Sequence, residues 1–227
     1  MSISSFVRRL SRDEDGGPLV EFTVMIPIVF TFLLGGVDFL NAFQQWSNAA
    51  KAVEIGARIA AVSDPVASGL NTIPTNAVSS CDGTSSTVCI GDAEPAFQVT
   101  CDGSAGTCSC TSGTCTGMGS YSADAMGLIV YGRDGKGKCG DATTEYFAGM
   151  CDIFAPILPK YVTVVYTQTG LGYAGRSLGP VPTITVSLNS GASKLPFNFF
   201  FLPFATINIP PVTTTITGEA LSSAAAN

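Results

Sequence analysis

The feature that most restricts this chain is an uncharged apolar run near its N-terminus. No residue from Phe22 to Val37 carries a charge, and a helix over this run would be about 24 Å long. Extension to Leu40 brings it near the shortest length that crosses a bilayer, whose hydrocarbon core is about 30 Å thick. Glu21 and Asp38 bracket the run, about 26 Å apart on a helix, so each carboxylate can sit near a membrane interface. The run therefore predicts one membrane-spanning helix.

The charges around the run predict its orientation. Three arginines (Arg8, Arg9 and Arg12) precede it, and no further lysine or arginine follows until Lys51. Positive charge is retained on the cytoplasmic side, so we expect residues 1–16 to be a cytoplasmic leader and the C-terminal domain to be periplasmic, on the outer side of a bacterial inner membrane. A cleavable signal peptide is the alternative. Its only formal cut site, residues 50–52, lies well inside the helical pattern described next.

The helical pattern continues beyond the apolar run. Apolar residues recur every three or four positions from Phe39 to Ala60, opposite a polar stripe, which is the period of an amphipathic helix. Glu54 and Arg58 form an i,i+4 pair in the favourable order. Pro65 ends the pattern, because the residue before a proline avoids the α conformation. We expect a transmembrane helix with an amphipathic extension over residues 17–62.

Small residues cover one face of this extension, and they make it a candidate contact between helices. Small side chains let two helices approach closely, and the candidate interface residues are Ala50, Gly56, Ala57 and Ala60. The pattern fits two arrangements equally well: contact with another subunit, or packing on the chain's own domain.

Composition excludes several classes of function. The chain has no histidine, so catalytic triads and imidazole general bases are ruled out. From Asp64 onward there are six basic against eleven acidic residues, which leaves no basic face for nucleic acid. We expect that the protein is not an enzyme, binds no cofactor and has no nucleic-acid partner. A hydrolase or thiol oxidoreductase would need a carboxylate pair or a C-x-x-C motif, and neither pattern is evident.

Eight cysteines fall within one 71-residue stretch. They are Cys81, Cys89, Cys101, Cys108, Cys110, Cys115, Cys139 and Cys151. An even number confined to a part rich in Gly, Ser and Thr is typical of a disulfide framework in an exported domain. An all-thiolate metal site is the weaker alternative. Eight cysteines allow 105 pairings, among which the sequence does not choose.

The residue pattern of the C-terminal part predicts β-strands. Residues 161–166 and 206–217 are rich in β-branched side chains, and residues 182–188 alternate with Ile184, Val186 and Leu188 on one face. Pro210 and Pro211 would interrupt the last of these strands. We therefore expect an α+β fold, with the helix followed by a disulfide-rich, antiparallel β-containing domain. Its parts are a Cys-rich segment over 63–156 and a β-rich segment over 157–227.

A phenylalanine-rich connection joins the last strands. Residues 195–204 hold five phenylalanines and two prolines, too short and too broken for a second membrane helix. Packing under the sheet is the simpler expectation. The other is an apolar patch for a partner or for the outer leaflet of the membrane.

Motifs around the leader resemble those of pilin-like proteins. The stretch from Arg12 to Phe22 (RDEDGGPLVEF) resembles the leader junction of type IV pilin-like proteins, in which a basic leader ends in Gly and a Glu lies five residues into the mature chain. Cleavage after Gly16 would make Gly17 the new N-terminus and Glu21 that fifth residue; Pro18 departs from the pattern. The stretches GVDF (36–39) and AVEIGAR (52–58) are similar to the TadE-like family of pilus-assembly proteins.

The resemblance implies a structural role. It implies a minor pilin or pseudopilin of the tight-adherence (Flp-type) pilus machinery, processed by a prepilin peptidase. Its partners would be other pilin-like subunits and pilus-assembly proteins, met through the N-terminal helix in the inner membrane, at the base of a surface pilus or within it. An unrelated membrane-anchored binding domain is the alternative.

Overall fold

A computed structural model describes residues 17–71, 89–132, 139, 148–175, 180–201, 206–218 and 221. By their contacts they fall into two compact units: residues 1–44 with 198–206, and residues 45–197 with 207–227. We call these the anchor unit and the sheet unit. The expected α+β class is confirmed, because a long N-terminal helix precedes an antiparallel sheet.

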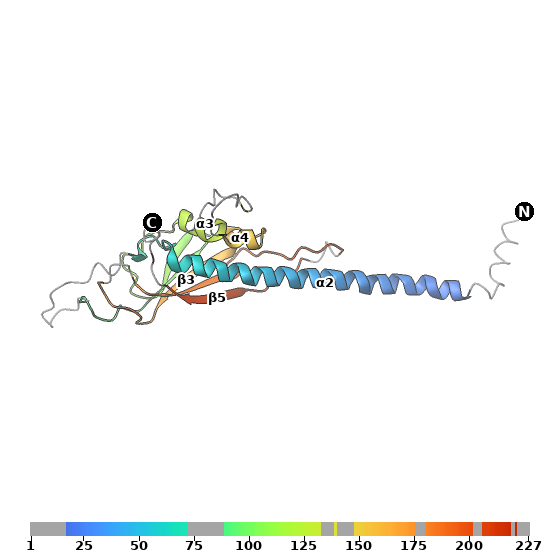
Figure 1. Ribbon diagram of the computed structural model, residues 1–227, viewed down its shortest axis with the longest axis horizontal. Helices are drawn as coiled ribbons and strands as arrows, with labels where there is room; N and C mark the ends of the chain where they lie inside the picture. The colour runs from blue at the N-terminus through green and yellow to red at the C-terminus, as the bar shows by residue number, and fades with distance from the viewer. Residues whose placement is uncertain are drawn as a thin grey trace, which may run out of the picture. The chain divides into compact units, whose positions relative to one another are not determined.

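The first element is helix α2 (Gly17–Val62), 46 residues long, and it contributes to both units. Figure 1 shows it as one continuous helix. The predicted pair between Glu54 and Arg58 is confirmed as an ion pair between two exposed side chains. The helix is followed by Ser63, Asp64 and Pro65, where the sequence predicted that it would end.

The sheet has five antiparallel strands in the order β2-β1-β3-β4-β5. They are β1 (Phe97–Asp102), β2 (Thr107–Gly113), β3 (Val162–Gln168), β4 (Thr183–Leu188) and β5 (Val212–Thr217). The face predicted for β4 is confirmed, since Ile184, Val186 and Leu188 are fully buried. β5 begins immediately after Pro211, because proline cannot donate to the ladder.

The core of the sheet unit forms between the sheet and helices. The second half of α2 contributes small side chains to it, and α3 (Ala123–Tyr131) and α4 (Met150–Ile153) contribute Met126, Ile129 and Met150. Ser122 caps α3, because its hydroxyl accepts a hydrogen bond from the N–H of Ala125. A short 3-10 helix, η3 (Pro159–Tyr161), leads into β3.

The segment after α2 is held by a close backbone contact. The N–H of Gly69 donates to the carbonyl of Met118, and that of Ser68 donates to Ser120. A Cβ on Gly69 would lie 2.1 Å from the carbonyl oxygen of Gly117. Only glycine fits here, because no larger residue leaves the backbones this close.

Two strands of the sheet, β1 and β2, come from the Cys-rich segment expected over residues 63–156, for which the sequence predicted no strand. β1 pairs with β3 along its whole length, so the sheet continues across the expected boundary at residue 157. The turn that connects β1 to β2 begins after Asp102, whose carboxylate accepts a hydrogen bond from the N–H of Ser104. β2 was missed because it is exposed on both faces and shows no apolar alternation. β1 does alternate, with Phe97, Val99 and Cys101 buried on one face, so its pattern could have been found in the sequence.

Candidate functional site

The apolar half of α2 is the first part of the candidate site. From Leu19 to Leu40 its large apolar side chains are exposed all round the helix, and none of the most apolar 18-residue window is buried. Among the described residues this is the one helix long and apolar enough to cross a membrane. A helix that is apolar on every side needs lipid or other helices around it, so this half fits a membrane anchor.

This half of α2 contains one proline and two threonines whose hydroxyls bond to the helix backbone. Pro27 lies inside α2 and has no N–H to donate to the preceding turn. Thr23 and Thr31 donate their hydroxyls at 2.7 Å to the carbonyls of Leu19 and Pro27, four residues earlier. These bonds keep the threonine hydroxyls away from lipid, where an unpaired polar group costs several kcal/mol.

Glu21 is exposed on the first turns of α2. It lies one helical turn after Gly17, the residue expected to become the N-terminus. Gly16, on the other side of the expected cut, lies outside the described residues. The structure therefore shows Glu21 as an exposed residue, while its role and the cleavage stay predictions.

The small-residue face of α2 needs a correction. Ala57 and Ala60 are buried in the core of the sheet unit, and so is Gly56. A Cβ on Gly56 would lie 2.6 Å from Sδ of Met150 in α4. Of the four expected interface residues, only Ala50 is half-exposed. Small residues are required here because α2 packs tightly against its own domain, so Gly56, Ala57 and Ala60 do not face another subunit.

A carboxylate of α2 binds the phenylalanine-rich loop, a contact that the sequence did not reveal. Asp38 is 1% exposed. Its Oδ1 accepts the N–H of Phe200 at 2.9 Å, and its Oδ2 accepts that of Phe201 at 3.0 Å. One helical turn away, Nδ2 of Asn41 donates at 2.7 Å to the carbonyl of Asn198. All of these residues belong to the anchor unit.

Both phenylalanines at this contact point away from the protein. Phe200 is 68% exposed and Phe201 is 47% exposed. Packing under the sheet, the simpler expectation for this segment, is therefore wrong for these two residues. Phe197, at the base of the loop, does pack against the core.

The base of the loop is clamped within the sheet unit. Residues 195–197 and 207–209 pair as a short antiparallel stem, with Pro196 opposite Asn208. Asn189 is fully buried; its Nδ2 donates to the carbonyls of Leu195 and Ile209, and its Oδ1 accepts the N–H of Leu195. Its φ of 61° is tolerated because asparagine enters the left-handed region more easily than most residues. This side chain fixes where the loop leaves the sheet unit.

Every cysteine among the described residues is disulfide-bonded. Cys101 pairs with Cys108 across β1 and β2, Cys110 pairs with Cys115, and Cys139 pairs with Cys151 of α4. Cys89 is bonded as well, and Cys81 lies outside the described residues. The disulfides that the sequence predicted are therefore present in the fold.

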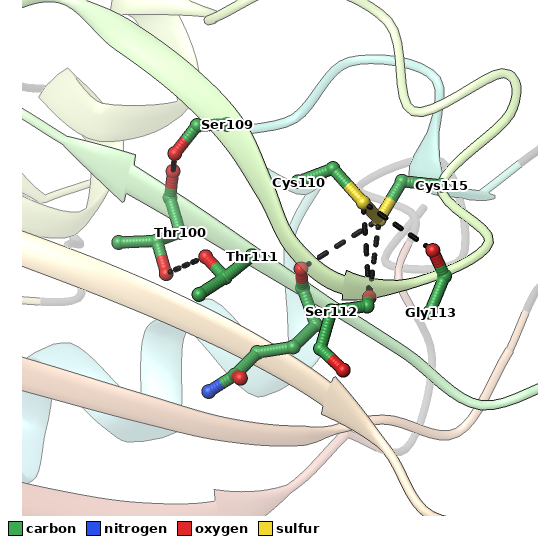
Figure 2. Close-up of a disulfide and its surroundings, with 8 residues drawn as sticks. Thr100, Ser109, Cys110, Thr111, Ser112, Gly113 and Cys115 are labelled. Atoms are coloured by element: carbon green, nitrogen blue, oxygen red, sulfur yellow. Dashed lines mark hydrogen bonds between the residues drawn. A yellow bond between two sulfur atoms is a disulfide. The ribbon is translucent and has the colours of Figure 1, made fainter.

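Figure 2 shows the bridge between Cys110 and Cys115 at the edge of the sheet. Its sulfurs lie 3.5–3.7 Å from the carbonyl oxygens of Gln98, Ser112 and Gly113. These are contacts rather than true hydrogen bonds, because a disulfide sulfur has no proton. The strand register shifts beside the bridge, and the hydroxyls of Thr100 and Thr111 meet at 3.0 Å. The bridge and the shift distort the free edge of β2.

Titratable groups do not gather into a reaction centre in the described parts. No group of three metal-binding side chains occurs there. Glu94 is buried, and burial raises the pKa of its carboxyl. Burial also raises the pKa of Tyr166 far above its usual value, although a hydrogen bond from Val66 opposes the shift. The Tyr166 hydroxyl is used as the acceptor for Val66, whereas Oε2 of Glu94 has no hydrogen-bond partner among the described residues.

Comparison with known proteins agrees with the anchor. No curated protein and no solved structure matches the chain. A family model does match, over residues 19–58, which include Glu21, Asp38 and the stretch from Ala52 to Arg58. This confirms the resemblance suggested by the motifs: over α2, the chain matches the family described as TadE-like protein.

Proposed function

We propose that the protein is a minor pilin or pseudopilin of a Flp-type, tight-adherence pilus machinery, with a structural role. The match to the TadE-like family supports involvement in the assembly of such pili. The main support for a pilin-like subunit role is the apolar half of α2. This half is exposed on all sides and has Glu21 on its first turns. A solitary anchor requires no carboxylate there, whereas subunits that meet through their helices can use one.

The physical basis of the assembly role is a charge pair near the membrane surface. After cleavage at Gly16, Gly17 would carry a free amino group. The carboxylate of Glu21 in a neighbouring subunit would bind this group, since an ion in an apolar surrounding requires a partner. The subunit contact would lie in the anchor unit, because the small-residue face is already packed on the sheet unit.

Orientation and location follow from two further features. The three arginines of the leader favour a cytoplasmic N-terminus. The disulfides favour an oxidising compartment for the sheet unit, which in a bacterium is the periplasm. The protein would then be a single-pass component of the inner membrane, processed by a prepilin peptidase.

N-terminal sequencing of the protein purified from membranes tests the processing step. We expect the mature chain to begin at Gly17, with its net charge still −6 because the leader carries three positive and three negative charges. An intact Met1 in cells that assemble pili would refute the pseudopilin proposal. A start near Val53 would do so too, and would instead support a cleaved signal peptide.

The alternative is an unrelated anchored binding domain, and loss of the peptidase separates the two. Deletion of the prepilin peptidase should leave the leader on a pseudopilin. It should not change the N-terminus of an unrelated anchored domain.

A further inference from the structure

The position of Asp38 on α2 indicates how deep in the membrane the phenylalanine-rich loop that it binds would lie. Asp38 lies seventeen residues after Glu21 on one helix, a rise of about 26 Å. The hydrocarbon core of a bilayer is about 30 Å thick. If α2 crosses the membrane, the residues bound to Asp38 lie where the helix leaves the far side of that core.

Several polar backbone groups of this loop are already hydrogen-bonded to side chains of α2, as the membrane surface requires. Non-helical backbone is unstable in lipid, because its N–H and carbonyl groups find no hydrogen-bond partner there. The Asp38 carboxylate binds the N–H groups of both Phe200 and Phe201, and Asn41 binds the carbonyl of Asn198. These polar groups are thus satisfied by α2 itself and do not need water.

The side chains at the same place are apolar and exposed. Phe200 and Phe201 join the exposed Phe39, Leu40 and Phe43 of α2, all within the anchor unit. No residue from 195 to 218 is charged. Together these side chains continue the apolar surface of the membrane-spanning half of α2, so the surface that surrounds the anchor extends onto the loop.

We propose that Phe200 and Phe201 insert into the outer leaflet of the membrane that α2 crosses, as a second lipid contact held by Asp38. The occupant of this surface is lipid, at the boundary between headgroups and acyl chains. Buried apolar area drives the contact. Because the loop is uncharged, binding does not depend on anionic lipid or on salt. This inference rests on the membrane anchor and not on the pilus role.

Fluorescence quenching in vesicles tests the contact. The chain has a single tryptophan, so Trp46→Phe gives a silent background for Phe200→Trp in the full chain. The protein is reconstituted in phosphatidylcholine and phosphatidylglycerol with phosphatidylcholine brominated near either end of its acyl chains. We expect about twofold quenching by bromine near the headgroup, as for an indole at the membrane interface, and less by bromine at the bilayer centre.

Two reporters show whether the result is specific. Tyr173→Trp replaces an exposed aromatic residue of the sheet unit and should not be quenched. Phe32→Trp, in the middle of the apolar run, should be quenched most by bromine at the bilayer centre. If Phe32→Trp is quenched and Phe200→Trp is not, the anchor stands and the proposed loop contact is refuted. Equal quenching of Phe200→Trp and Tyr173→Trp would also refute it.

Substitution of Asp38 tests what holds the loop. Asp38→Ala removes both acceptors, so quenching of Phe200→Trp should fall towards that of Tyr173→Trp, while Phe32→Trp reports that the anchor is still inserted. Retention of full quenching in Asp38→Ala would overturn the role of Asp38. A blue-shifted emission of Phe200→Trp that no brominated lipid quenches would place the loop against protein and overturn the lipid contact.

Discussion

The phenolic oxygen of Tyr166, in β3, accepts a 2.9 Å hydrogen bond from the backbone N–H of Val66. The two residues are 100 positions apart in the sequence, and both are fully buried. The bond ties the segment that follows α2 to the middle strand of the sheet.

Tyr166→Phe should therefore destabilise the sheet unit. The change leaves the N–H of Val66 buried without its acceptor, which costs about 1–3 kcal/mol. Chemical denaturation of the full chain in detergent, followed by circular dichroism, measures the loss. Tyr173→Phe is the matched control on an exposed tyrosine and should change stability by less than about 0.5 kcal/mol. Equal stability of the two variants would contradict the role of this bond.

The packing of α2 on its own domain predicts a large effect at Ala57. Ala57→Glu places an unpaired carboxylate in the core, at a cost of several kcal/mol. We expect a strong fall in the melting temperature of the detergent-solubilised chain. Val62→Glu, at an exposed position of the same helix, is the control and should lower it only slightly. A stable Ala57→Glu variant that lacks only subunit contacts would instead restore the small-residue face as an interface between subunits.

Glu21→Ala tests the assembly role. It removes the proposed partner of a neighbouring amino group without touching the sheet unit, so we expect normal expression and membrane insertion but loss of surface pili, scored by electron microscopy. Glu54→Ala makes the same change at an exposed site of α2, where it removes only a surface ion pair worth about 0.3–0.5 kcal/mol. Normal piliation in Glu21→Ala would remove the physical support for the proposal.

The disulfides should contribute unequally to stability. The bridge between Cys101 and Cys108 joins β1 to β2 beside the core, and Cys101 is fully buried. Cys101→Ala with Cys108→Ala should cost about 2–4 kcal/mol. Cys110→Ala with Cys115→Ala removes a bridge at the exposed edge and should cost less. Denaturant titration measures both pairs, and a larger loss in the second pair would contradict this ranking.

The state of the thiols is a separate prediction. We expect all eight cysteines to be paired in protein purified from membranes. A thiol-reactive dye, added under denaturing conditions without reductant, should label less than one thiol per chain. Two or more labelled thiols would favour metal or redox chemistry instead.

Glu94 should make stability depend on pH. Burial raises its pKa above the ordinary 4.5, so the folded state binds a proton more readily than the unfolded state. Its contribution is therefore most favourable at low pH and is lost as the pH rises through the folded pKa. The stability of Glu94→Gln relative to the wild type should thus increase from pH 4.5 to pH 7. Glu54→Gln, on the exposed face, should show no such trend.

The sequence predicted those elements whose side chains show a regular pattern. The uncharged run gave the helix, and the alternation from Ile184 to Leu188 gave β4, because burial on one side imposes a period. The period also predicted that Gly56 and Ala57 lie on a packed face of the helix, but it did not show whether that face packs on another subunit or on the chain's own domain. That depends on α3 and α4, which come together with α2 only in the fold. The sequence could not show the bond from Asp38 to Phe201, because it joins residues 163 positions apart.

The three described bridges between located cysteines close loops of only 7, 5 and 12 residues. If the sheet unit is exported as proposed, the two cysteines of each pair would emerge from the translocation channel almost together, and oxidation could follow within a few residues of export. By contrast, β1 must wait for β3, about sixty residues later, to gain its second neighbour. The bridge between Cys101 and Cys108 would then lock the hairpin of β1 and β2 while the rest of the sheet is still crossing the membrane. These three bridges can thus form before the sheet is complete.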